Sequence, residues 1–204
     1  MVIGLTEKRE QRIRAVFEEK GPILRSKQLR EHKVDSQSVQ ALLAQGKLIR
    51  LKEGYYVWQD QADLLTDAQI ATGVIPGATL FYLSAAVHYG LTTLIPERVY
   101  VAVPNRGLEP KKPDYPPVEI SRLSHRLYLL GRTATDEGHY LLPVYDREKT
   151  VCDIAKRMDA VGKDVLIEVI RSYLNGPKNL QKLYHYANIM RVQKRIHPYI
   201  EAIV

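Results

Sequence analysis

A short stretch near the N-terminus combines side chains that can hydrogen-bond to a base with side chains that can contact phosphate. Residues 36–45 read SQSVQALLAQ, and residues 48–52 alternate apolar with basic side chains. Glutamine and serine can reach base edges in a groove, whereas lysine and arginine neutralise phosphates. The chemistry that this stretch predicts is recognition of double-stranded DNA.

The first part of the stretch is predicted to be an amphipathic helix. Asp35 or Ser36 can accept hydrogen bonds from the free N–H groups of the first turn. Val39, Leu42 and Leu43 recur at the spacing of one helix face, so we expect them to face a core. Four polar or small residues lie mostly off this stripe and are the predicted base contacts: Gln37, Ser38, Gln40 and Ala41.

A hairpin is predicted to follow this helix. Gly46 fits the left-handed conformation in which many helices end. The alternation in 48–52 and the β-rich run 55–58 predict two strands joined by a tight turn. Strand alternation places one of Tyr55 and Tyr56 inside and the other outside.

Two helices are predicted before it. Thr6 can cap a helix that runs to about Lys20, and Ser26 can cap a short helix over 27–32. Helices joined by a short turn and followed by a hairpin form a winged helix-turn-helix. The predicted phosphate contacts on this domain are Arg25, Lys27, Lys47, Arg50, Lys52 and, through its hydroxyl, Tyr55.

Length and charge suggest two domains of unequal size. The 204 residues suit a winged helix-turn-helix domain over 1–60 and a second domain over 66–204, separated by the polar run 59–63. Residues 1–60 hold 12 Lys/Arg against 8 Asp/Glu, a denser basic excess than in the remainder of this chain of net charge +7. This distribution favours a polyanionic partner, although a basic surface kept for solubility is the alternative.

The second domain is predicted to be mixed α+β and to end in a helical run, so the fold class is α+β. Its strands are expected before its long helices. Helices are predicted at 67–74 and 79–89, strands at 98–103, 118–123, 127–130 and 140–144, with a turn at 135–138, and further helices at 147–159, 163–174, 180–191 and 195–203.

Residues 105–117 are predicted to form an exposed basic loop, because four prolines and a glycine exclude regular structure. Arg106, Lys111 and Lys112 lie in it. A solvated loop without a ligand is the simpler interpretation. The alternative is that these three residues add contacts to the DNA backbone from the second domain.

Enzyme chemistry finds little support in the sequence. The chain has no phosphate-binding glycine loop, no dinucleotide fingerprint and no nucleophile elbow. Asp146, Glu148 and Lys149 resemble the carboxylates and lysine of a metal-dependent nuclease, but Asp146 more simply caps a helix. The histidines lack metal-ligand spacing and Cys152 is the single cysteine. We expect no catalytic residue, no metal and no cofactor.

The sequence also carries information about location. No apolar run approaches the length of a membrane span, and the N-terminus lacks the apolar segment of a signal peptide. One cysteine cannot form an internal disulfide. We therefore expect a cytoplasmic protein with no membrane partner.

Three segments together resemble the AbiEi antitoxins of abortive-infection type IV toxin–antitoxin systems. The first is the hairpin QGKLIRLKEGYYV, which many regulators share. The second, LSAAVHYGLTTLIPERVYVAVPNR (Leu83–Arg106), is similar to the opening of the family's second domain. The third, YDREKTVCDIAKR (Tyr145–Arg157), is similar to the entry to its terminal helices. The resemblance covers almost the whole chain in the expected order.

The resemblance implies two functions. The N-terminal domain would bind the promoter of its own operon, at repeated sites, and repress it. The second domain would neutralise a nucleotidyltransferase-like toxin without forming a stable complex with it. The alternative is a winged-helix transcriptional regulator whose second domain senses a ligand or dimerises.

Overall fold

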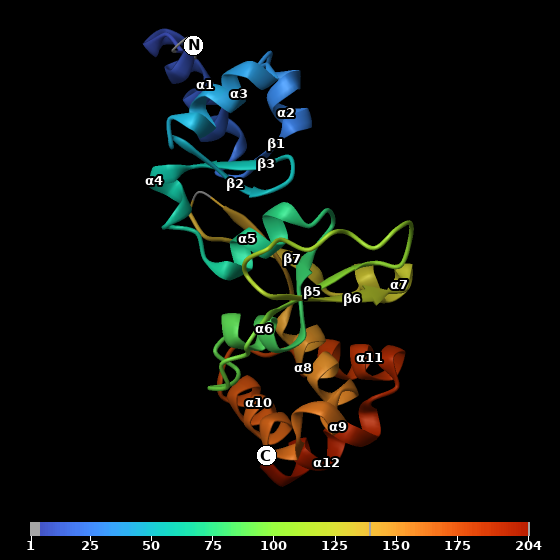
Figure 1. Ribbon diagram of the computed structural model, residues 1–204. Helices are drawn as coiled ribbons and strands as arrows, with labels where there is room; N and C mark the ends of the chain where they lie inside the picture. The colour runs from blue at the N-terminus through green and yellow to red at the C-terminus, as the bar shows by residue number, and fades with distance from the viewer. Residues whose placement is uncertain (1–4, 139, 204) are drawn as a thin grey trace.

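The computed structural model describes residues 5–138 and 140–203, which form an α+β fold with helices and two β-sheets. Figure 1 shows an elongated molecule with the N-terminal helices at one end and the C-terminal helices at the other. The larger sheet lies between them. Of the residues described, none belongs to a helix that is both long enough and apolar enough to span a bilayer.

Three helices form most of the N-terminal part. Helix α1 spans Glu7–Lys20, α2 spans Ser26–Glu31 and α3 spans Ser36–Ala44, close to the predicted bounds. The predicted cap of α2 is wrong by one residue, because Ser26 is already helical and Arg25 precedes it as the N-cap. The Ser26 N–H instead donates to the Gly54 carbonyl at 2.8 Å, which ties α2 to the hairpin.

A three-stranded antiparallel sheet completes this part. Strand β1 covers Leu24–Arg25, β2 covers Leu48–Lys52 and β3 covers Tyr55–Trp58, in the order β1-β3-β2. The predicted hairpin is thus confirmed, and β1 adds a strand that the sequence did not indicate. The short helix α4, Gln59–Ala62, follows β3 directly where a polar linker was predicted.

An apolar core fills the space between these helices and the sheet. Phe17, Leu42 and Trp58 are among its buried residues. The Trp58 ring is 2% exposed and lies edge-on to Phe17 with 5.9 Å between ring centroids. The Arg14 guanidinium covers the Trp58 ring at 5.3 Å and also pairs with Asp60, so α1 is fastened to the end of β3.

The larger sheet has five strands in the order β6-β5-β4-β8-β7. β4 pairs with β5 antiparallel and with β8 parallel, β5 with β6 parallel, and β7 with β8 antiparallel. As predicted, Val99, Val101 and Val103 share one face and are buried. The strands are β4 Thr79–Leu80, β5 Val99–Pro104, β6 Val118–Leu123, β7 Arg132–Asp136 and β8 Leu141–Tyr145.

Three predicted elements of this part are wrong. Residues 79–80 are a central strand rather than the start of a helix, so helix α6 begins later and spans Tyr82–His88. The apolar run 127–130 lies in helix α7, His125–Leu129, and in the residue after it, because a short apolar run does not distinguish helix from strand. The turn predicted at 135–138 starts too early, because residues 132–136 form strand β7, which sheet pairing with β8 stabilises.

Helices enclose the second core and form the C-terminal end. The helix predicted at 147–159 is broken after Lys156, whereas the other predicted helices are confirmed within about two residues. The helices are α5 Asp67–Val74, α8 Arg147–Lys156, α9 Met158–Val161, α10 Lys163–Asn175, α11 Leu180–Met190 and α12 Gln193–Ile203.

The β2–β3 hairpin joins the two parts of the molecule. Tyr55 and Tyr56 are 9% and 8% exposed, so the prediction that one of them is outside is wrong. Their side chains do point to opposite faces, but both faces are covered. Tyr56 belongs to the N-terminal core, whereas Tyr55 packs with Ile23 and Leu51 on a core built around α5 and the larger sheet.

Gly73 on α5 allows Ile23 of the N-terminal part to pack closely against this helix. A Cβ atom added to Gly73 would lie 2.6 Å from Ile23 Cδ1 and 3.3 Å from the Tyr140 hydroxyl. A contact of 2.6 Å is well inside van der Waals distance, so a larger residue must displace the N-terminal part or the Ile23 side chain.

We predict that Gly73→Val lowers the free energy of unfolding by about 1–3 kcal/mol through overpacking. Gly73→Ala should cost less, because Cδ1 is the mobile end of the Ile23 side chain and alanine favours the helix. Urea unfolding of Gly73→Val, of Ile23→Ala and of the double variant gives the coupling energy between positions 73 and 23. If Gly73→Val costs the same with and without Ile23→Ala, the contact does not limit the junction.

Candidate nucleic-acid interface

The exposed face of α3 is uncharged. Ser36, Gln37, Gln40 and Ala44 are exposed along it. The two glutamines are where they were predicted to be, and their amides can both donate to and accept from a base edge. Ser36 and Ala44 were not predicted, although the four-residue spacing from Ser36 through Gln40 to Ala44 is the signal that identifies this face.

Two predicted base contacts are not on this face. Ser38 is 3% exposed and Ala41 is 7% exposed, so the expectation that they lie off the apolar stripe is wrong. The buried arc of α3 is wider than Val39, Leu42 and Leu43 alone indicate. A small residue on a helix is compatible with either face, so its size does not show which way it points.

The position of α3 is fixed at both ends. The Asp35 carboxylate accepts the Ser38 N–H at 2.7 Å, and this hydrogen bond lowers the pKa of Asp35 below its ordinary value of 3.8. Asp35 also pairs with Arg9 of α1. Beyond the other end of α3, the Lys47 ammonium lies 2.5 Å from a Glu10 carboxylate oxygen, again on α1. These contacts tie both ends of the α3 region to α1.

The elements next to α3 carry exposed basic side chains. Arg25 and Arg50 are exposed, as predicted, and neither forms an ion pair with any residue in the described ranges. Lys27 lies 3.9 Å from Glu31, and Lys47 is paired with Glu10, so both predicted phosphate contacts are partly neutralised.

Two further basic residues on this surface were not predicted. Arg30 is exposed on α2, and it lines a hollow of about 80 Å³ together with Ser36 and Gln40 of α3. Lys33 occupies the turn between α2 and α3 with a left-handed φ of 60°. Arg30 lies near the end of α2 and Lys33 in the turn after it, so both precede the start of α3 closely.

Lys52 and Tyr55 lie differently from the prediction. The Lys52 ammonium donates to the Lys111 carbonyl at 2.5 Å and to the Val74 carbonyl at 3.4 Å, and it covers the Tyr55 ring. Burial, together with the nearby Lys111 charge, lowers the pKa of Lys52 below 10.5. These two side chains are occupied at the junction with α5 and are not free to meet phosphate.

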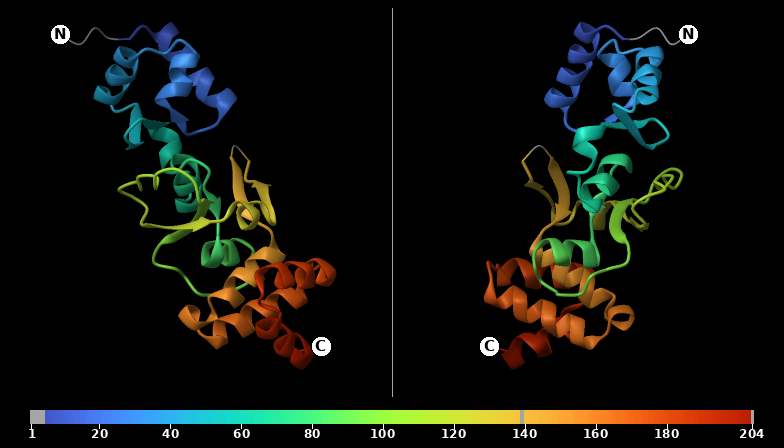
Figure 2. Two further views of the ribbon diagram at one scale, coloured as in Figure 1. Left: turned by 90° about the vertical axis from the view of Figure 1, so that its right-hand side faces the viewer. Right: turned by 60° about the vertical axis from the view of Figure 1, so that its left-hand side comes forward.

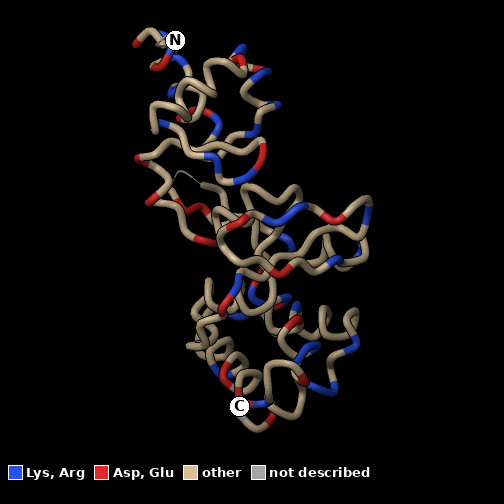
Figure 3. The backbone as a smooth tube through the Cα atoms, viewed as in Figure 1, with Lys and Arg blue, Asp and Glu red and all other residues tan. Residues whose placement is uncertain are grey.

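The loop 105–117 lies beside the hairpin. Lys111 extends to 3.7 Å from Glu53 in the β2–β3 turn, and its carbonyl accepts from Lys52. Arg106, Lys111 and Lys112 are all exposed. In Figure 3, segments of Lys and Arg follow the side formed by α2, this turn and the loop, with acidic segments between them. The loop therefore extends the basic surface of the N-terminal part.

The residues considered for nuclease chemistry lie in the C-terminal half, away from α3 (Figure 1). Asp146 caps α8 by accepting the Lys149 N–H at 2.8 Å, as predicted. The Lys149 ammonium lies 2.6 and 2.7 Å from the two carboxylate oxygens of buried Asp153. Lys182 lies 2.9 Å from Asp146 and 3.3 Å from Glu148. Within the described ranges, no three His, Cys, Asp or Glu residues are grouped closely enough to hold a metal ion.

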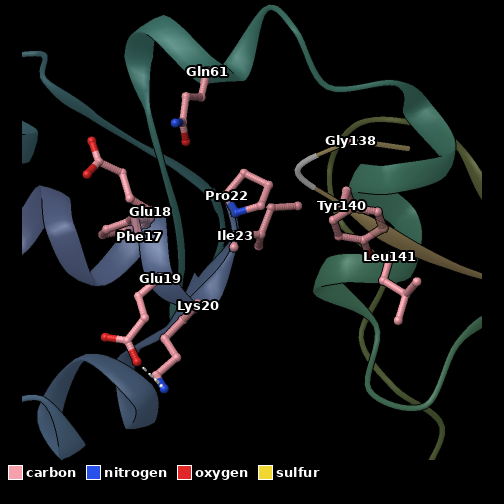
Figure 4. A pocket seen from close by; sticks show the side chains of 11 residues that line it. Phe17, Glu18, Glu19, Lys20, Pro22, Ile23, Gln61, Gly138, Tyr140 and Leu141 are labelled. Atoms are coloured by element: carbon pink, nitrogen blue, oxygen red, sulfur yellow. Dashed lines mark ion pairs between the residues drawn. The ribbon is translucent and has the colours of Figure 1, made fainter. Parts of the chain in front are cut away.

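An open space of about 770 Å³ lies between the end of α1 and the β7–β8 hairpin. Phe17, Pro22 and Ile23 line it on one side, with Tyr140 and Leu141 on the other (Figure 4). Binding sites are often found at such junctions between parts of a molecule.

Comparison with models of protein families gives no match, and comparison with curated proteins gives none either. Among solved structures, the chain is similar to a crystal structure of the Rv2827c protein from Mycobacterium tuberculosis. The TM-score is 0.49 and the sequence identity is 15%, over 96% of this chain and 83% of that chain.

Proposed function

We propose that the N-terminal part is a winged helix-turn-helix domain that binds double-stranded DNA. The observation that carries this proposal is the uncharged, hydrogen-bonding face of α3, with exposed basic side chains on the neighbouring elements. A helix of this kind can enter the major groove while the basic residues contact the backbone. The order of α2, turn, α3 and β2–β3 hairpin supports the same conclusion.

Each side chain then has a role. Gln37 and Gln40 read base edges, and Ser36 lies beside them near the start of the helix. The residues that contact phosphates are Arg25, Lys27, Arg30, Lys47 and Arg50. Arg106, Lys111 and Lys112 contribute further backbone contacts from the loop, in place of Lys52 and Tyr55.

We further propose that the chain is a promoter-binding autorepressor and the antitoxin of a type IV system. This proposal rests on the resemblance of Leu83–Arg106 and Tyr145–Arg157 to AbiEi antitoxins. Bound at repeated sites in its own promoter, the protein would occlude transcription. It acts in the cytoplasm, without enzymatic activity or a cofactor, and opposes a nucleotidyltransferase-like toxin without a stable complex.

A second candidate is a winged-helix regulator that senses a small ligand. The open space between α1 and the β7–β8 hairpin favours it, because its walls come from both parts of the molecule. Gln61 at this space has a buried amide oxygen without a hydrogen-bond partner among the described residues. A ligand there would alter the coupling between the DNA-binding part and the larger sheet.

We predict that Arg50→Ala weakens binding to all DNA sequences about equally. Loss of one phosphate contact should reduce the slope of log K against log salt by about 0.9. Fluorescence anisotropy over a salt series, with the upstream DNA of the gene and a random duplex, measures this. Arg171→Ala is the matched control, since Arg171 is exposed on α10 in the C-terminal half and its removal should leave the slope unchanged.

We predict that Gln40→Ala mainly loses discrimination between operator and random DNA. A base contact contributes about 1–3 kcal/mol of discrimination, whereas its loss leaves phosphate contacts intact. Ser38→Ala is the control on the same helix, because the buried Ser38 side chain cannot reach a base. A specificity ratio that is unchanged in Gln40→Ala, or that falls equally in both variants, would contradict the orientation of α3.

Co-expression tests the antitoxin proposal. The full chain should rescue growth of cells that express the adjacent nucleotidyltransferase-like gene. A full-length variant carrying Gln37→Ala, Gln40→Ala and Arg50→Ala should lose repression of the promoter and retain rescue, because the two functions reside in different parts. The full chain is needed since Tyr55 completes the apolar core around α5. Absence of rescue by the wild type would favour the ligand-sensing regulator.

A further inference from the structure

Strand β7 forms one edge of the larger sheet. It is the last strand in the order β6-β5-β4-β8-β7 and pairs only with β8 among the described strands. In both views of Figure 2 the β7–β8 hairpin stands on the opposite side of the sheet from the loop 105–117. Its edge is therefore distant from the surface proposed to bind DNA.

The hydrogen bonds at the two ends of the hairpin show which backbone groups face outward. The Glu137 N–H donates to the Tyr140 carbonyl at 3.0 Å, and the Asp146 N–H donates to the Gly131 carbonyl at 2.8 Å. Opposed residues in an antiparallel ladder alternate between bonded and non-bonded pairs. The odd-numbered residues of β7 thus bond to β8, and the even-numbered residues direct their N–H and C=O groups to the open edge.

Three residues present these groups: Arg132, Ala134 and Asp136. All three are exposed, and none of their backbone groups takes part in a hydrogen bond with another described segment. An unpaired edge of this kind is a template for a further strand. Pro143, which lies opposite Ala134 on β8, is compatible with the ladder because this pair is a non-bonded one.

The sequence of the edge is complementary to itself. In an antiparallel pair of two β7 strands centred on Ala134, Arg132 of each copy lies opposite Asp136 of the other. Thr133 lies opposite Thr135, which is a favourable cross-strand pair. Arg132, Ala134 and Asp136 each direct one N–H and one C=O outward, which makes six groups in each copy. In this register all six form hydrogen bonds with the other copy. Two opposite-charge pairs and six backbone hydrogen bonds form at once.

We propose that β7 is a dimerisation edge that binds the β7 strand of a second copy of this chain. The charges at its ends, which in isolation would protect an edge from pairing, select the antiparallel register in this case. Arg132 also donates through Nε to Thr79 at 2.9 Å, and Asp136 accepts the Gly138 N–H through Oδ1 at 3.0 Å. The Arg132 guanidinium also covers the Tyr128 ring at 5.3 Å, so this side chain turns toward the open edge when it pairs with Asp136 of the second copy. Asp136 Oδ2 accepts no hydrogen bond from another described residue.

The interface is short, so dimerisation depends on protein concentration. Five residues a strand bury much less area than the interfaces of permanent dimers. The pair joins the two larger sheets into one, and this geometry leaves both copies of α3 and the loop 105–117 uncovered. The inference is independent of the proposed function, because it concerns self-association without DNA.

Sedimentation velocity of the full-length protein over a hundredfold range of concentration tests the proposal. The wild type should change from monomer to dimer. Asp136→Lys places two basic residues opposite each other, and Arg132→Glu places two acidic residues opposite each other. Each variant alone should associate at least tenfold more weakly. An equal mixture of the two restores both opposite-charge pairs and should dimerise like the wild type.

Rescue in the mixture separates the interface from misfolding, since misfolded variants would not restore each other. Ala134→Pro removes one outward N–H without touching the ladder with β8, and it should also prevent dimerisation. Thermal unfolding checks that each variant remains folded. A wild type that stays monomeric throughout, or a dimer that tolerates both charge reversals, would overturn the proposal.

Discussion

The half-buried Lys52 ammonium, held between the carbonyls of Val74 and Lys111, is the polar contact that joins the β2–β3 hairpin to the rest of the molecule. It fastens the β2–β3 hairpin simultaneously to the end of α5 and to the loop 105–117. A lysine with lowered pKa at such a junction carries a desolvation cost, which two carbonyl acceptors and the Tyr55 ring offset. The hairpin therefore connects the two parts of the molecule, and these contacts restrict its movement toward a DNA groove.

This constraint explains how the candidate interface extends beyond the N-terminal part. With Lys52 and Tyr55 occupied, the loop 105–117 brings further basic residues to the β2–β3 turn, where Lys111 lies 3.7 Å from Glu53. The position of that loop is coupled to the hairpin through the Lys111 carbonyl.

The elements that could be predicted are those whose signals are local. The Asp35 cap, the apolar spacing of α3 and the alternation in β2 are encoded by neighbouring residues. Strands β4 and β7 could not be found in this way. Thr79–Leu80 is a strand because β5 and β8 lie on both sides of it, and polar β7 is a strand because β8 supplies its partner groups. The exposure of Gln37, Gln40 and Arg50 could likewise be predicted from local spacing, whereas the burial of Ser38 and Ala41 and the contacts of Lys52 depend on distant segments.

Trp58 gives the molecule a built-in optical probe. It is the single tryptophan of the chain and lies in the N-terminal core, edge-on to Phe17 and beneath Arg14. Its emission therefore reports on the N-terminal part, whereas circular dichroism is dominated by the helices beyond it. If the unfolding transitions seen by tryptophan emission and by circular dichroism coincide, the contacts of the β2–β3 hairpin make the whole chain unfold as one cooperative unit.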